Sequence, residues 1–148
     1  MIANIPNAAK ALGYTSVEFE ELLATALRNG LGCVCLRSIM TKSNDIQEIQ
    51  HKCNIIEDCN KCPYMRIAVT SKENLVDTLI LIDHFERNHE EMAALNMERF
   101  ENVWMPHWAR AISTIELAKA HPSVSRTLLD EAHSMASQIG SATLPPLF

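Results

Sequence analysis

The stretch TSKENLVDTLILIDHFERNHEEMAALNMERFENVW, from Thr70 to Trp104, predicts the longest helix of this chain. Thr70 and Glu73 form a capping box, which opens the helix at about residue 71. An apolar stripe then recurs at helical spacing, made by Leu75, Leu79, Ile82, Ala93, Phe100 and Val103. One unbroken helix of this length would span about 50 Å. Because a compact domain of this size does not need such a length, we expect a break near Asn96, or a protruding end that pairs with a partner.

Other parts of the chain also carry helical patterns. Helices are predicted over residues 7–12, 15–30, 45–56, 106–120 and 124–139. Pro106 suits the first turn of its helix, and Gly30 and Gly140 suit helix ends. The apolar segment 31–40 fits either a helix or one buried strand, since periodicity does not separate the two.

These patterns predict an all-α fold. We expect a compact bundle of five to six helices, with an irregular cysteine-bearing segment over residues 31–63. The bundle would be a single helical domain over residues 1–140, followed by an extended tail over 141–148, which contains Pro145 and Pro146. A length of 148 residues with 47% hydrophobic and 21% charged residues is ordinary for one globular domain.

The charge and hydropathy of the sequence argue against two classes of partner, nucleic acids and membranes. A net charge of −5 argues against a general nucleic-acid or anionic-membrane surface, which normally needs clustered Lys and Arg. The apolar run Leu79–Ile82 is bounded by Asp77 and Asp83 and is too short to span a bilayer. Residues 1–6 lack a basic region followed by an apolar run, so we expect a cytoplasmic protein in a reducing compartment.

All five cysteines fall within 30 residues: Cys33, Cys35, Cys53, Cys59 and Cys62. The two-residue spacing between Cys59 and Cys62 lets both thiolates reach one ion. Cys53 would be the third ligand and Cys35 the best fourth, with Cys33 or His51 as substitutes. Such a set would hold a structural zinc ion or an iron–sulfur cluster. Buried reduced thiols explain the same cysteines equally well, because free cysteine is among the most buried residue types, and a dithiol–disulfide switch is the third interpretation.

The segment Cys59-Asn-Lys-Cys62-Pro-Tyr-Met-Arg66 resembles the cysteine–proline stretch of iron–sulfur quinolinate synthases over about a dozen residues. This chain is much shorter than that three-domain enzyme. The resemblance therefore favours cluster chemistry and implies no activity.

Two carboxylate–histidine pairs occur at a spacing of three residues. Glu86 with His89, and Asp130 with His133, match the pairs that hold di-iron sites in four-helix bundles. Glu86 and His89 fall on the apolar stripe, whereas the second pair falls on a solvated face. The alternative to a metalloenzyme is a half-buried His89 hydrogen-bonded to a neighbour, with Asp130 and His133 in solvent.

Residues 8–19, AAKALGYTSVEF, resemble the helix-turn-helix of bacterial regulators. The helix that would contact DNA, from Thr15 to Leu23, contains Glu18, Glu20 and Glu21 and no Lys or Arg. Because those carboxylates would face phosphates, nucleic acid is an unlikely partner and a transcription regulator is the alternative rather than the first hypothesis.

No part of the sequence combines a nucleophile with a positioned base, a glycine-rich phosphate loop or a credible pair of acids. The sequence therefore favours a small non-catalytic regulatory or adaptor protein that binds another protein or forms a homodimer. Aromatic residues dominate such contacts, so Phe100, Trp104 and Trp108 are the predicted partner-binding anchors.

Overall fold

The computed structural model describes residues 27–28, 30–35, 60 and 65–140. Its internal contacts divide the chain into two compact units. The first comprises residues 1–29 and 33–68, and the second comprises residues 30–32 and 69–148. The prediction of a single domain over residues 1–140 stays a prediction, and the tail from residue 141 lies outside the described residues.

The described part of the first unit contains a small antiparallel sheet. Its strands, in the order β1-β2-β3, are β1 (Leu27–Arg28), β2 (Val34–Cys35) and β3 (Met65–Arg66). The register pairs Leu27 with Cys35 and Val34 with Arg66. The strand alternative for residues 31–40 is thus confirmed at β2. The helix predicted over 15–30 is wrong at its end, because backbone pairing with β2 places Leu27 and Arg28 in a strand.

The second unit begins with helix α6 (Lys72–Leu95). Ser71 is its N-cap, since the Ser71 hydroxyl accepts a hydrogen bond from the Asn74 backbone N–H at 3.3 Å. The predicted cap at Thr70 is therefore one residue too early. The first half of α6 is buried through Leu75, Val76, Leu79, Ile80, Leu81 and Phe85.

The predicted break near Asn96 is confirmed. Asn96 adopts an extended conformation, with φ −160° and ψ 94°, which ends α6 at Leu95. Its side chain then accepts a hydrogen bond from the Arg99 N–H at 3.1 Å and so caps the short helix α7 (Met97–Arg99). One asparagine therefore ends one helix and begins the next.

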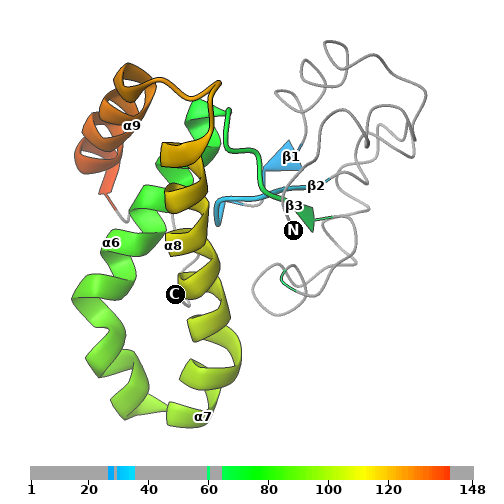
Figure 1. Ribbon diagram of the computed structural model, residues 1–148. Helices are drawn as coiled ribbons and strands as arrows, with labels where there is room; N and C mark the ends of the chain where they lie inside the picture. The colour runs from blue at the N-terminus through cyan, green and yellow to red at the C-terminus, as the bar shows by residue number, and fades with distance from the viewer. Residues whose placement is uncertain (1–26, 29, 36–59, 61–64, 141–148) are drawn as a thin grey trace. The chain divides into compact units, whose positions relative to one another are not determined.

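The chain returns without a second break. After α7 comes the π-helical turn η2 (Phe100–Trp104), which leads into α8 (Met105–Ala120) through residues that all keep helical backbone angles. Pro106 lies in the first turn of α8, as predicted. Helices α6 and α8 run side by side in opposite directions and form a hairpin (Figure 1).

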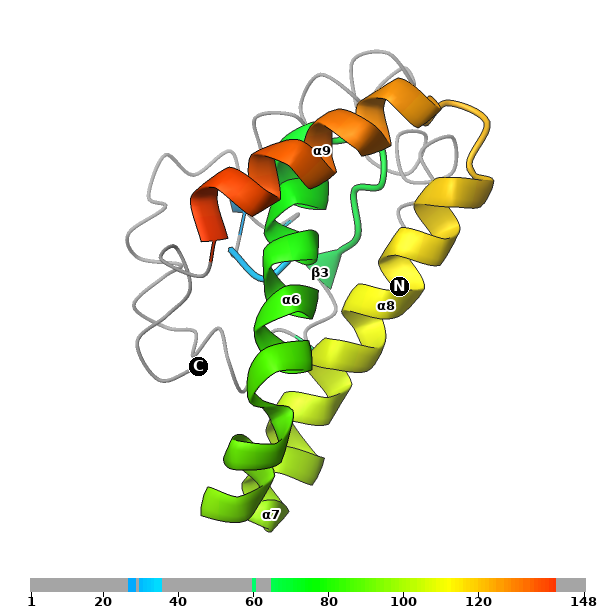
Figure 2. The same cartoon turned by 90° about the vertical axis from the view of Figure 1, so that its left-hand side faces the viewer.

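Helix α9 (Arg126–Ile139) completes the second unit. The Ser125 hydroxyl caps it by accepting from the Leu128 N–H at 3.0 Å, and Gly140 ends it with φ +65°. Helix α9 crosses α6 near the beginning of α6 (Figure 2). At this crossing Ala132 is fully buried, and Lys72 Nζ lies 2.9 Å from Glu131 Oε2. The small Ala132 side chain allows the two helices to approach closely.

A short segment from earlier in the chain, residues 30–32, completes this unit. The buried Asn74 amide of α6 donates to the Gly32 carbonyl at 2.6 Å, and Arg110 of α8 donates to the Leu31 carbonyl at 2.6 Å. Arg110 also contacts His107 Nδ1 at 3.0 Å. Because a guanidinium only donates, His107 Nδ1 accepts, so the buried His107 ring is neutral with its proton on Nε2.

Across the described residues the structure is mostly helical with little strand, in agreement with the all-α prediction. The predicted count of five to six helices is not supported there. The described residues contain three helices of more than two turns (α6, α8 and α9), beside the short α7 and η2. In the same residues no helix is both long and apolar enough to cross a membrane.

Candidate functional site

The closed end of the α6–α8 hairpin exposes apolar side chains. We call residues 90–105, from the last turns of α6 through α7 and η2 to Met105, the hairpin tip. Leu95 is 80% exposed, Met97 55% and Met105 46%. The other two strongly exposed large apolar side chains among the described residues are Ile112 and Ile139. Single exposed apolar residues are common on protein surfaces, but three of these five lie within the eleven residues 95–105 and so form a concentration.

The turn geometry explains this exposure. Leu95 and Met97 flank Asn96, whose extended backbone interrupts the helical register between them. Met97 therefore does not continue the buried stripe of α6, and Leu95 lies in the last turn of α6, beyond the end of that stripe at Phe85. The same local structure that reverses the chain thus presents these two side chains to solvent.

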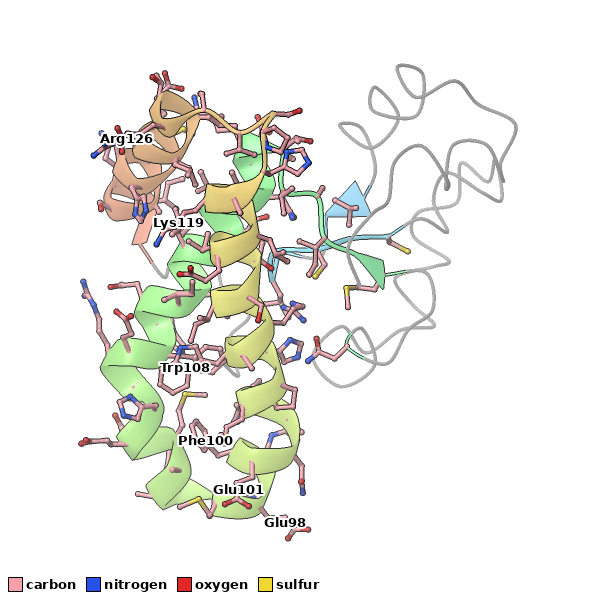
Figure 3. All side chains as sticks on the ribbon, viewed as in Figure 1. Glu98, Phe100, Glu101, Trp108, Lys119 and Arg126 are labelled. Atoms are coloured by element: carbon pink, nitrogen blue, oxygen red, sulfur yellow. The ribbon has the colours of Figure 1, made fainter. Side chains whose placement is uncertain are left out.

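Acidic residues are concentrated in the tip and in the two turns of α6 before it. The segment from Asp83 to Glu101, both included, has six acidic and two basic residues and so carries −4 of the chain's net charge of −5. Five of the six are exposed glutamates without an ion-pair partner within the described part of the chain: Glu86, Glu90, Glu91, Glu98 and Glu101. Figure 3 shows Glu98 and Glu101 at the turn and the basic Lys119 and Arg126 toward the opposite end of the unit.

The predicted aromatic anchors lie mainly inside the unit. Phe100 is 7% exposed and Trp104 is 5% exposed, with the Arg99 guanidinium 4.9 Å from the centre of the Trp104 ring. Trp108 is half-buried and stacks on Phe85 with ring centroids 5.6 Å apart. Figure 3 shows Phe100 and Trp108 between α6 and α8. Their partner-binding role stays a prediction, and in this structure they support the hairpin.

The two members of the first carboxylate–histidine pair, Glu86 and His89, differ in burial. Glu86 is exposed and is not on the buried face, contrary to the predicted stripe, because the stripe of α6 ends one residue earlier at Phe85. His89 is half-buried, with Nδ1 3.0 Å from the Phe85 carbonyl oxygen and its ring 5.1 Å from that of Trp108. This is the hydrogen-bonded alternative expected for His89.

The second pair, Asp130 and His133, is exposed on α9, which agrees with the expected alternative to a metal site, in which both residues are in solvent. Among the described residues no three His, Cys, Asp or Glu side chains gather closely enough to hold a metal ion. The metalloenzyme alternative on Glu86 and His89 is left without a third ligand in that part of the chain and stays a prediction.

Most of the predicted cysteine site lies outside the described residues, namely His51, Cys53, Cys59 and Cys62. Cys33 is buried beside β2, and Cys35 is half-buried at its end. The helix-turn-helix segment 8–23 is also outside the described residues, so the transcription-regulator alternative is untested.

Leu95, Met97 and Met105 were not predicted as site residues. The sequence indicates these residues only in part: Leu95 and Met97 are apolar residues on either side of Asn96, where a break was expected, and they lie within an acidic segment. Comparison of the chain with protein-family models, curated proteins and solved structures found no match.

Proposed function

We propose that this chain is a small, non-catalytic, cytoplasmic protein with a regulatory or adaptor role, which acts by binding another protein through the hairpin tip. The observation that carries the proposal is the exposure of Leu95 and Met97 on either side of Asn96. Burying a leucine or methionine side chain contributes about 1.5–3 kcal/mol. Because folding leaves most of this contribution unused at the tip, a partner that covers both side chains would recover it.

The packing behind the tip supports the same proposal. Phe100 and Trp104 are buried directly after α7, so the exposed residues stand on a well-packed base rather than on a loose loop. A rigid surface loses less conformational entropy when it binds than a mobile one. The aromatic residues predicted as anchors would thus act indirectly, by holding the tip in shape.

Photo-crosslinking tests this proposal. A benzophenone amino acid replaces Met97 in the intact protein, and a matched variant carries it at Ser134, an exposed position on α9. We expect a discrete crosslinked product from position 97 and little from position 134, because only the tip would face a partner. Equal crosslinking from both positions would contradict the proposal.

The cysteine site forms a second part of the proposal. The spacing of Cys59 and Cys62, with Cys53 and Cys35 as further ligands, supports a zinc ion or an iron–sulfur cluster. We expect stoichiometric zinc by elemental analysis of anaerobically purified protein, or iron with absorption in the visible range. Protein without either metal would indicate reduced thiols instead.

A further inference from the structure

We infer that the partner of the hairpin tip presents an apolar depression bordered by lysine or arginine side chains. The inference rests on the proposed function and adds the chemistry of the partner. The inference is based on two features that occur together in the tip: the most exposed apolar side chains and most of the net negative charge of the chain.

The exposed apolar side chains of the tip are Leu95 and Met97. The tip is the closed, outward-curving end of the hairpin, where α7 joins the two long helices (Figure 1). A convex apolar surface is covered best by a concave one, since complementary shapes exclude water from the contact. The depression in the partner would therefore be lined by apolar or aromatic side chains.

The charge contribution comes from Glu90, Glu91, Glu98 and Glu101, which are exposed in the same segment. Charges at the rim of an interface accelerate association and select between partners, more than they add affinity. Arg87 is paired with Asp83 at 3.1 Å, and Arg99 lies over the Trp104 ring. The two basic groups of residues 83–101, Arg87 and Arg99, thus already have contacts within the chain. The exposed glutamates remain available to a basic rim on the partner.

A second copy of the chain fits the tip less well than a basic partner. Contact between two tips would bring together two segments, residues 90–105 of each copy, that each carry a net charge of −3. Their separation would be within the Debye length of about 8 Å at physiological salt, so the repulsion would be only partly screened. Electrostatic complementarity therefore favours a different protein over a dimer formed through the tips.

Two matched peptides serve as probes of the apolar and charge preferences of the tip, and not of the shape of its partner. One is an amphipathic helix of about 15 residues made of leucine and lysine, and the other has glutamate in place of each lysine. Binding to the intact protein is measured by fluorescence anisotropy at about 25 mM and about 300 mM salt. We expect the lysine peptide to bind more tightly, with an affinity that falls as salt rises.

Two pairs of substitutions separate the apolar and the charge contributions. Leu95→Ser with Met97→Ser is expected to weaken binding of the lysine peptide at least about tenfold. Glu98→Gln with Glu101→Gln is expected to weaken it about fivefold and to reduce its salt dependence. The matched control is Glu116→Gln with Asp130→Asn, two exposed carboxylates outside the tip, which should change binding less than about twofold.

Failure of the lysine peptide to bind would overturn the inference. Equal binding of both peptides, lost on substitution of Leu95 and Met97, would overturn the basic partner and leave the proposed function standing. Binding of the lysine peptide that does not depend on Leu95 and Met97 would overturn both. A dimer in sedimentation equilibrium that dissociates on Leu95→Ser would make a second copy the occupant of the tip and overturn the inference.

Discussion

Replacement of Gly32 by alanine is expected to lower the free energy of unfolding by about 3 kcal/mol. Gly32 has φ +92°, a conformation that costs an L residue roughly 1–2 kcal/mol. An added Cβ would also lie 3.3 Å from Thr78 Cβ and still closer to Thr78 Oγ1. The hydroxyl cannot turn away freely, because Oγ1 donates to the Asn74 carbonyl at 2.8 Å. Overpacking of this kind typically costs a further 1–3 kcal/mol or so.

The chain offers a matched control in Gly30. Gly30 has φ +77°, but no atom lies within 4 Å of an added Cβ. Gly30→Ala should therefore cost about 1 kcal/mol, from the backbone alone. Urea unfolding followed by helical circular dichroism measures both variants. Gly32→Ala in a Thr78→Ala background should approach the cost of Gly30→Ala. Equal costs for the two single glycine variants would show that Gly32 does not pack against Thr78.

Replacement of Asn74 by aspartate is expected to cost about 3 kcal/mol, although the two side chains have nearly the same shape. The Asn74 amide is fully buried and donates to the Gly32 carbonyl at 2.6 Å. A carboxylate in this place loses the donor, and a buried charge then faces a carbonyl oxygen. Asn74 is in the first turn of α6, where an acidic residue gains about 0.3–1 kcal/mol from the helix dipole. That gain is too small to offset the loss.

Asn88→Asp is the matched control for this variant. Asn88 also donates to a carbonyl, that of His84 at 2.9 Å, but it is half-buried, so water can replace the lost hydrogen bond. We expect a cost below about 1 kcal/mol by the same urea titration. An Asn74→Asp variant as stable as Asn88→Asp would show that Asn74 does not hold residues 30–32 against α6.

The helices of the second unit could be predicted from local signals. The length of the pattern over 70–104 indicated a break near Asn96 or a protruding end, and Pro106 and Gly140 marked a helix beginning and a helix end. The cap of α6 was displaced by one residue because Thr70 and Ser71 are both good N-caps. Only the position of the side chain relative to the Asn74 N–H separates them.

The exposed surface of the hairpin could not be predicted in the same way. The prediction of one helical stripe over 70–104 placed Phe100 on the same helix face as Leu75. The break at Asn96 and the π-helical turn change the helical register after residue 95, so that one continuous stripe does not describe this part of the chain. After the break Phe100 and Trp104 turn inward and Met97 turns outward, while Leu95 is exposed in the last turn of α6, before the break. The sequence contained both groups, and the fold of the turn determined which of them is exposed.

The contacts that hold residues 30–32 were also beyond local patterns. Asn74 reaches a carbonyl 42 residues away, and Arg110 reaches one 79 residues away. Periodicity within a window of 11–18 or so residues does not report on such pairs. These polar contacts across the unit were therefore found only in the structure.

Whether Leu95 and Met97 contact a partner is decided by the ratio of crosslinking yields from positions 97 and 134 in the intact protein. We expect a yield at position 97 at least several times that at 134, and a fall to the level of 134 when Leu95 is replaced by serine. Helical circular dichroism should stay unchanged, because Leu95 is 80% exposed and contributes little to folding. Equal yields at the two positions, or a yield at position 97 that Leu95→Ser leaves unchanged, would contradict that contact.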